Sequence, residues 1–426
     1  PLLLLVGISQ LLLFNSCRSL STARYDDFMA RGDYAKAQTM SKKGDKLLWD
    51  LQAASASRAA GDFEESNRLF DLAEEQFNRY RASSNWPTYM AQLAQTLSND
   101  TAFAYRGEVY EGMMINTYKA LNFMSMKNWQ YARVELNRAY ERQRRAVEHY
   151  SDEIRASEEL MRDYGYNFNL KRLMRRSSFQ EIRDVVAYSD YVNPLINLIE
   201  GAYLLNKGDS ADRDRADHTL RRLLSMSRSS EVEKARKSGQ GKTWVLIENG
   251  QAMRKKEWRM DLPTFILRDV GIKELRGVNV VSVALPELVS VASRHHRFSV
   301  NSQSADLVAD MDQMVKANHD QAFRGILTRA LISATVKATA QYWSEKKWGQ
   351  WGNIAVSILS AASTRADTRT WSGLAKNYHF ALVENGGVEI KSAGKTLLKT
   401  QTKGASLLFV KVSTDGKVTS QVINFE

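Results

Sequence analysis

The sequence is poor in cysteine, proline and glycine. One cysteine, five prolines and 23 glycines are spread over 426 residues. A single thiol excludes an internal disulfide framework and a zinc site built from cysteine pairs. The scarcity of proline and glycine argues against long disordered linkers. With 43% hydrophobic residues, the chain has the composition of a folded protein, long enough for about two or three domains.

Motifs for catalysis and cofactor binding are also missing. The stretch GQGKTW at 239–244 resembles part of a phosphate-binding loop, but Arg236 stands where that motif needs a glycine. A phosphate-binding loop follows a strand and leads into a helix, whereas here the predicted strand comes after the loop. The six histidines form no His-Glu-x-x-His pattern, and no Gly-x-Ser-x-Gly elbow is present. We therefore expect no cofactor, no metal site and no enzymatic activity.

The single cysteine ends an apolar leader. PLLLLVGISQLLLF is too short to span a bilayer, and Ser16 then precedes Cys17. This pattern is similar to a bacterial lipoprotein signal, although Phe14 and Asn15 depart from the usual residues. It predicts a signal peptide over 1–16, clipped at its N-terminus, and a lipid on Cys17. A buried helix that happens to contain a cysteine is the alternative.

Arg18 follows the cysteine, where an aspartate would favour retention in the inner membrane. We therefore expect a lipid-anchored protein on the periplasmic face of the bacterial outer membrane. Because the chain is expected to be exported, we expect no nucleic-acid partner for the net charge of +12. Anionic lipid, lipopolysaccharide or an acidic envelope protein would suit that charge.

Basic residues are concentrated in 213–259, which holds 13 Lys or Arg against six Asp or Glu. This surplus predicts a surface for a protein partner, although a solubilising loop pair would look the same. The residues proposed to bind the partner are Arg254, Lys255, Lys256 and Lys242.

Short polar turns recur before helical patterns in the first half of the chain. RGDYAKA at 31–37, AGDFEES at 60–66 and KNWQYARVELNRA at 127–139 share this arrangement, and 206–224 is a weaker copy. The pattern predicts an irregular tetratricopeptide-like helical domain over 17–240. Apolar stripes on its helices are expected in the core. The arginine-rich face around Arg138 and Arg142 is expected to be solvated.

The second half of the sequence has patterns typical of strands as well as of helices. Strands are expected at 242–250, 257–261 and 278–288, followed by a helix over 304–346, so that 241–365 forms a mixed segment. An apolar stretch at 352–363 is expected to be a buried helix. The remainder, 366–426, is expected to be an antiparallel β domain. Its predicted strands are 378–383, 388–391, 405–412 and 418–425. The predicted fold class is α+β.

Six segments together resemble an uncharacterised family of bacterial envelope lipoproteins with a tetratricopeptide-like N-terminal half. They are YEGMMINTYKALNFM (110–124), ARVELNRAYERQ (132–143), TWVLIENG (243–250), RMDLP (259–263), VALPEL (283–288) and ADTRTWSGLAKNYHFALV (366–383). The resemblance covers about residues 20–425. It implies placement in the periplasm or at the outer membrane and brings no catalytic residues.

Members of that family are often encoded near other outer-membrane lipoproteins, including activators of cell-wall synthases. The expected function is a lipid-anchored periplasmic scaffold or adaptor, which binds protein partners through its helical repeats and its β-rich C-terminal domain. An enzyme that acts on envelope glycans or lipids through an unrecognised active site is the alternative.

Overall fold

The structure is a computed structural model. It describes residues 22–41, 46–81, 104–163, 193–263, 265, 280–320, 322–323, 325–331, 333–334 and 365–426. Cys17, the predicted signal peptide and the apolar stretch 352–363 lie outside these residues. The fold is α+β, with the helices mainly in the first half of the chain and the strands in the second, as the sequence predicts.

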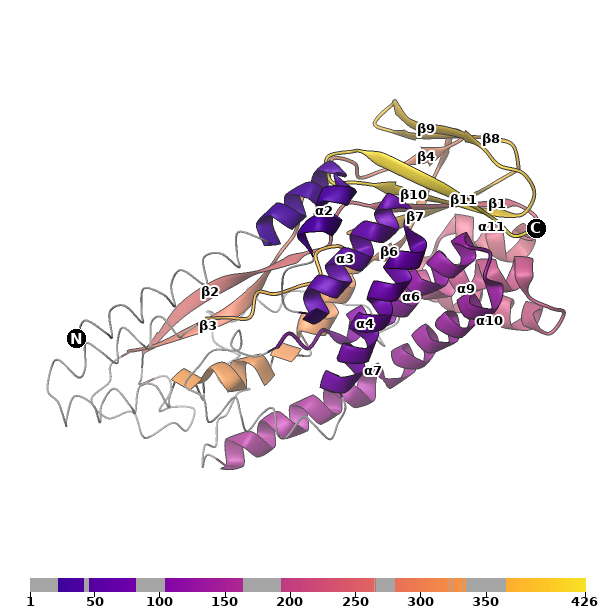
Figure 1. Ribbon diagram of the computed structural model, residues 1–426. Helices are drawn as coiled ribbons and strands as arrows, with labels where there is room; N and C mark the ends of the chain where they lie inside the picture. The colour runs from indigo at the N-terminus through magenta and orange to yellow at the C-terminus, as the bar shows by residue number, and fades with distance from the viewer. Residues whose placement is uncertain are drawn as a thin grey trace, which may run out of the picture.

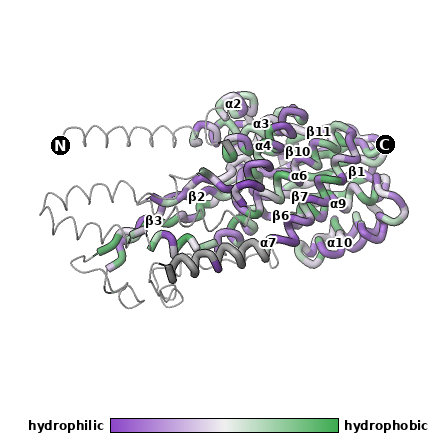
Figure 2. The backbone as a smooth tube through the Cα atoms, turned by 60° about the horizontal axis from the view of Figure 1, so that its bottom comes forward, coloured by the Kyte–Doolittle hydropathy of each residue, from purple (hydrophilic) through white to green (hydrophobic). Residues whose placement is uncertain are grey.

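The first half of the described chain forms helices that pair as antiparallel neighbours. Residues 22–31 are helical. The helices that follow are α2 (Tyr34–Met40), α3 (Lys46–Ala60), α4 (Phe63–Arg81), α6 (Val109–Ser125), α7 (Trp129–Asp163), α9 (Pro194–Lys207), α10 (Asp212–Ser227) and α11 (Ser230–Ser238). In Figure 2, hydrophobic residues mark α6 and α9, whereas α7 and α10 are largely hydrophilic. The first pair is therefore central, and the second covers it.

The predicted turns between helices are present. Gly32 and Gly61 adopt φ of +73° and +87°, which glycine reaches without a steric penalty. Each is followed by an aspartate and then by the aromatic residue that begins the next helix, Tyr34 or Phe63. Lys127 takes the same left-handed conformation before Trp129. The helical hairpins are confirmed, but a tetratricopeptide-like repeat is not.

The second half supplies three sheets. The strands are β1 (Thr243–Asn249), β2 (Arg254–Pro263), β3 (Val280–Val289), β4 (Ser299–Val300), β5 (Gln303–Ser304), β6 (Asp306–Asp310), β7 (Asn377–Val383), β8 (Gly387–Ser392), β9 (Lys395–Gln401), β10 (Ser406–Val412) and β11 (Val418–Asn424). They form a five-stranded sheet in the order β11-β10-β1-β7-β6, a four-stranded sheet in the order β5-β4-β8-β9, and the ribbon β2-β3. Figure 1 shows the five-stranded sheet between the helices and the four-stranded sheet.

Alternating side chains of the five-stranded sheet enter two different cores, because neighbouring residues of a strand point to opposite faces. Val245 and Ile247 of β1 pack toward the four-stranded sheet, against residues such as Ile390. Trp244 and Leu246 pack toward the helices. The sheet is thus buried on both faces, and its central strands are mainly apolar.

A buried ionic cluster fixes α3 on the helical face of this sheet. Glu248 of β1 accepts a hydrogen bond from Arg58 of α3 at 3.1 Å and pairs with Lys411 of β10. The Arg58 guanidinium lies over the rings of Tyr118 and Phe409, at 4.5 and 4.2 Å from their centroids. These contacts join a helix from the first half of the chain to two strands from the second.

Two predictions about the second half are wrong. Residues 306–310 form β6 rather than the start of a helix, because Asp306, Leu307 and the residues after them pair with β7. The 366–426 segment does not form a separate β domain. Its strands β7 and β10 lie on either side of β1, so one sheet includes residues from both predicted regions.

Candidate functional site: a groove between α4 and α7

A groove of about 700 Å³ lies between α4 and α7, in the range typical of ligand sites. The α4 wall is acidic, with Asp71, Glu74 and Glu75, and the α7 wall is mainly basic. The other residues that line the groove are Phe77, Asn78, Arg81, Val109, Arg138, Glu141, Arg142, Arg145 and Ala146. The walls therefore carry opposite charge over a partly apolar base.

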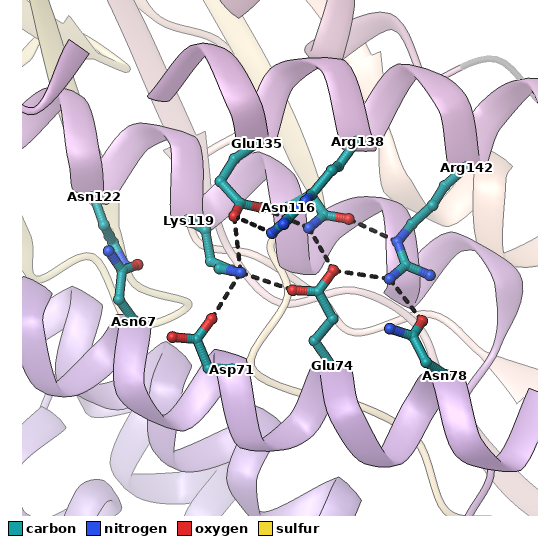
Figure 3. A network of polar contacts seen from close by, with 10 residues as sticks. All are labelled: Asn67, Asp71, Glu74, Asn78, Asn116, Lys119, Asn122, Glu135, Arg138 and Arg142. Atoms are coloured by element: carbon teal, nitrogen blue, oxygen red, sulfur yellow. Dashed lines mark hydrogen bonds and ion pairs between the residues drawn. The ribbon is translucent and has the colours of Figure 1, made fainter. Parts of the chain in front are cut away.

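One lysine connects the helices beneath the groove. The Lys119 side chain of α6 is 2% exposed, and its Nζ lies 2.8 Å from Asp71, 2.7 Å from Glu74 and 2.9 Å from Glu135 (Figure 3). Its three N–H groups thus each have a carboxylate partner, on two different helices. Lys119 joins α4 to α7 through α6.

Asn116 and Arg142 complete this network. Asn116 Nδ2 donates to Glu74 at 2.8 Å and to Glu135 at 2.6 Å, and its Oδ1 accepts from Arg142 Nε at 2.7 Å. Arg142 Nη2 also donates to Glu74 and to Asn78, and Figure 3 shows it reaching across from α7 to α4. The polar atoms on the two walls are therefore held in fixed positions.

The network is neutral as a whole. Its three carboxylates, on Asp71, Glu74 and Glu135, are matched by the cations of Lys119, Arg138 and Arg142. Burial alone would raise the pKa of Glu74, but Lys119 and the hydrogen bonds from Asn116 and Arg142 lower it to about 2. Glu74 is accordingly ionised at neutral pH.

The base of the groove is formed by an aromatic ring under two guanidinium groups. Phe77 is 4% exposed. Arg142 lies 5.2 Å and Arg81 lies 5.5 Å from its ring centroid. Arg81 also donates to the backbone oxygen of Gly107 at 2.5 Å. The two guanidinium groups thus lie over the ring, which leaves a mixed cationic and apolar surface at one end of the groove.

Helical spacing explains why these residues meet. Asp71, Glu74 and Asn78 follow one face of α4, and Asn116 and Lys119 follow one face of α6 at a spacing of three. The sequence contained a signal that our prediction did not use, since Asn116 and Lys119 are polar residues within a mainly apolar helix. Arg142, expected on a solvated face, is instead only 22% exposed and bridges two helices.

A second polar cluster surrounds the start of α6. Glu111 is fully buried. Its Oε1 accepts from Tyr105 Oη at 2.6 Å and from the backbone N–H of Trp371 at 3.2 Å, and its Oε2 accepts from the backbone N–H of Glu108 at 2.9 Å. The Glu111 carboxyl group thus joins the start of α6 to the segment before β7.

The neighbouring Glu108 has a cationic partner, and the two carboxyl groups differ in pKa as a result. Glu108 accepts from Lys255 Nζ at 2.5 Å and from Asn318 at 2.9 Å. Burial would raise its pKa, but Lys255 lowers it to about 2. Glu111 lacks a direct cationic partner among the described residues, so burial, followed by the charge of Glu108, raises its pKa to about 7.

The structure places Lys255 away from the surface predicted to bind a partner. Its side chain is 10% exposed and points to Glu108, whereas Arg254 pairs with Asp26 at 3.2 Å. Successive residues of a strand point to opposite faces, so Lys255 faces away from Arg254 and Lys256. Lys255 is therefore separated from the two residues that were predicted with it.

The other two predicted residues are also in ion pairs. Lys256 is 59% exposed and lies 3.2 Å from Glu287 of β3, and Lys242 lies 2.6 Å from Glu384. Lys242 precedes β1 and Arg254 follows it, so these residues lie at opposite ends of that strand. Partner binding by Arg254, Lys256 and Lys242 stays a prediction, as does lipidation of Cys17, which lies outside the described residues.

Within the described part of the chain, no group of three or more His, Cys, Asp or Glu side chains could hold a metal ion. No helix in that part has the length and apolar character needed to cross a membrane. No family model, curated protein or solved structure matches the chain.

Proposed function

We propose that the chain is a lipid-anchored scaffold or adaptor of the bacterial cell envelope, and that it binds a protein partner in the groove between α4 and α7. The observation that carries this proposal is the groove itself, with acidic and basic walls, an aromatic base and a rigid polar network beneath it. Protein interfaces commonly combine such a polar rim with a buried aromatic or arginine centre.

The charges in the groove favour binding over catalysis. Glu74 is ionised and shares its oxygens with Lys119, Asn116 and Arg142, so it is poorly suited to exchange a proton. A polypeptide segment with basic side chains toward α4 and acidic side chains toward α7 would match both walls. The apolar leader that ends at Cys17 supports the anchored location.

Photo-cross-linking in cells tests the groove. A photoreactive residue replaces Asn78, which lines the groove, or Leu72, which is on the same helix, 41% exposed and not among the lining residues. We expect a discrete protein adduct from position 78 and none from position 72. Adding Arg145→Glu, a change at an exposed position of the opposite wall, should reduce the adduct at least about tenfold.

Equal adducts from positions 78 and 72, or an adduct from 78 that Arg145→Glu leaves unchanged, would contradict binding in the groove. The anchor is tested separately, since the wild-type chain should incorporate labelled palmitate and Cys17→Ser should not. Labelling that does not depend on Cys17 would contradict the anchored location only.

The enzyme alternative has one specific observation in its favour. Two neighbouring carboxyl groups with pKa values of about 2 and about 7, as for Glu108 and Glu111, are typical of acid–base sites. Incubation with labelled cell-wall glycan and with envelope lipid would test this function. The enzymatic function requires that the wild type forms product. It also requires that the Glu111→Gln variant is folded and forms none.

A further inference from the structure

The edges of the described sheets differ in how they are protected against pairing with another strand. β6 carries Asp306 and Asp310 and is interrupted by a bulge. β9 carries Lys395 and Lys399, and its pairing with β8 is also irregular. Charged residues and bulges are the common means by which proteins prevent edge-to-edge association.

β11 has none of these features. It is the outer strand of the five-stranded sheet, runs for seven residues as VTSQVIN, and contains no charged residue, proline or glycine (Figure 1). Its pairing with β10 is regular over the whole strand, from Ser406↔Asn424 to Val412↔Val418. Val422 is 39% exposed. A seven-residue, regularly paired and uncharged edge of this kind is a template for another strand.

The hydrogen-bond pattern shows which backbone groups face outward. Ser413 N–H donates to Lys417 O, and Phe425 N–H donates to Ala405 O, on either side of the ladder. Hydrogen-bonded pairs alternate in an antiparallel ladder, so the odd-numbered residues of β11 face β10. The outward residues are consequently Val418, Ser420, Val422 and Asn424. Within the described chain, the outward N–H and C=O groups of these four residues have no backbone hydrogen-bond partner.

We propose that two copies of the chain pair through antiparallel β11 strands centred on Gln421, which joins their five-stranded sheets into one. In this register Val418 lies opposite Asn424 of the second copy, and Ser420 lies opposite Val422 of the second copy. All four are outward residues, so every outward N–H of β11 meets an outward C=O. The pairing is the same from either copy, as a two-fold interface requires.

The charges at the two ends of β11 suit a second copy. Lys417 precedes the strand and Glu426 follows it, while the strand itself is neutral. Antiparallel pairing brings the Lys417 end of one copy to the Glu426 end of the other, so the flanking charges are opposite in sign. No like charges face each other across the strands, and β-branched Thr419 lies opposite Ile423. The proposal is independent of what the groove binds.

Disulfide cross-linking of the full chain in membranes tests this register. Gln421→Cys places two thiols on the two-fold axis, where the Cα atoms of a non-hydrogen-bonded pair are about 4.5 Å apart. That separation is within the range for a disulfide. We expect mild oxidation to convert most of this variant to a covalent dimer. The unsubstituted chain, which contains only Cys17, is the background control.

Ser420→Cys is the matched control for register. Its two copies would lie about 8–9 Å apart, because each faces residue 422 of the other copy, and this exceeds disulfide reach. It should give at least about tenfold less dimer than Gln421→Cys. Adding Val422→Lys to Gln421→Cys should remove the cross-link, since it places new positive charge in both strands at an already exposed position.

Circular dichroism of each variant confirms folding. A dimer from Gln421→Cys that Val422→Lys abolishes, with little dimer from Ser420→Cys, supports the pairing. Background-level cross-linking of folded Gln421→Cys overturns it. Equal cross-linking of the two cysteine variants also overturns it, because that result indicates random collision rather than one register.

Discussion

The two faces of the five-stranded sheet are stabilised in different ways. On the face toward the four-stranded sheet, the core is made of side chains such as Val245, Leu408 and Ile390. The helical face also buries Glu248, Lys411 and Arg58, and the helices beyond it bury Lys119 with its carboxylate partners. Mainly apolar side chains fill the space between the two sheets. The helical layer joins distant segments, and each buried ion pair there requires a specific partner.

The two kinds of packing differ in how strictly they fix the positions of the helices and strands. Apolar contacts tolerate small shifts, whereas a buried charge is stable only with its partner in place. The ionic network therefore sets how α4, α6 and α7 lie relative to one another, and with them the walls of the groove. The comparison can be tested by removing one kind of interaction at a time.

The largest effect is expected from Lys119→Met. The substitution leaves the carboxylates of Asp71, Glu74 and Glu135 without their shared cation, so the free energy of unfolding should fall by about 4 kcal/mol. Urea denaturation measures this change. Arg138→Met is the matched control, because Arg138 is 55% exposed and its loss should reduce stability by less than about 1 kcal/mol. Equal effects would contradict a central role for Lys119.

Leu408→Ala tests the apolar face. Leu408 is fully buried between the two sheets, and its truncation should lower the free energy of unfolding by about 3 kcal/mol. The effect should be the same at low and high salt, because no charge is involved. A strong dependence on salt would mean that polar interactions also stabilise this core.

Glu111→Gln should change how stability depends on pH. The pKa of Glu111 is raised to about 7 in the folded state from its ordinary value of 4.5, so the folded protein binds the proton more tightly. The protonated Glu111 carboxyl group therefore adds to the free energy of unfolding. This contribution is fully present below pH 4.5 and is lost as the pH rises through 7. Between pH 5 and 7.5 the wild type should lose about 2 kcal/mol relative to Glu111→Gln.

The comparison with Glu111→Gln isolates one group. His319 and His379 have pKa values lowered to about 4 by burial, so their contribution falls as pH falls, but it is common to both proteins. Thermal unfolding at a series of pH values gives the difference directly. Parallel stability curves for the two proteins would show that Glu111 ionises normally.

The smallest effect is expected from Lys256→Met, because its ion pair with Glu287 is exposed to solvent. Stability should fall by less than about 1 kcal/mol, and less still at high salt. Lys255→Met, one residue away, should be much more destabilising, because it leaves Glu108 buried without a cation. A reversal of this order would contradict the assignment of Lys255 to the interior.

Much of the secondary structure could be predicted from local sequence. TWVLIENG, YHFALV and SLLFVKV are rich in β-branched, aromatic and other apolar residues, and they form β1, β7 and β10. The strand order could not be predicted, because β1 pairs with residues more than 120 positions away. β9 was missed since KTLLKTQ is mostly polar, and β6 was misread because Leu307 and Met311 share a helical spacing.

The candidate site was less predictable than the fold. Arg138 and Arg142 have the spacing of a solvent-exposed helical face, and only the position of α4 shows that Arg142 reaches Glu74. The basic stretch 254–256 has the composition of a binding surface, yet strand geometry turns Lys255 inward to Glu108. A cluster of basic residues indicates that these residues have acidic partners. It does not show whether those partners belong to the same chain or to another protein.

Amide hydrogen exchange at the groove tests the central claim most directly. The protein is compared in native envelope membranes and after purification in detergent. A bound partner should slow exchange in 71–81 of α4 and 138–146 of α7 by at least about tenfold in membranes, and Arg145→Glu should reverse this. The helix α10, which does not line the groove, should exchange equally in both samples. Identical exchange of the groove walls in the two samples would contradict the account.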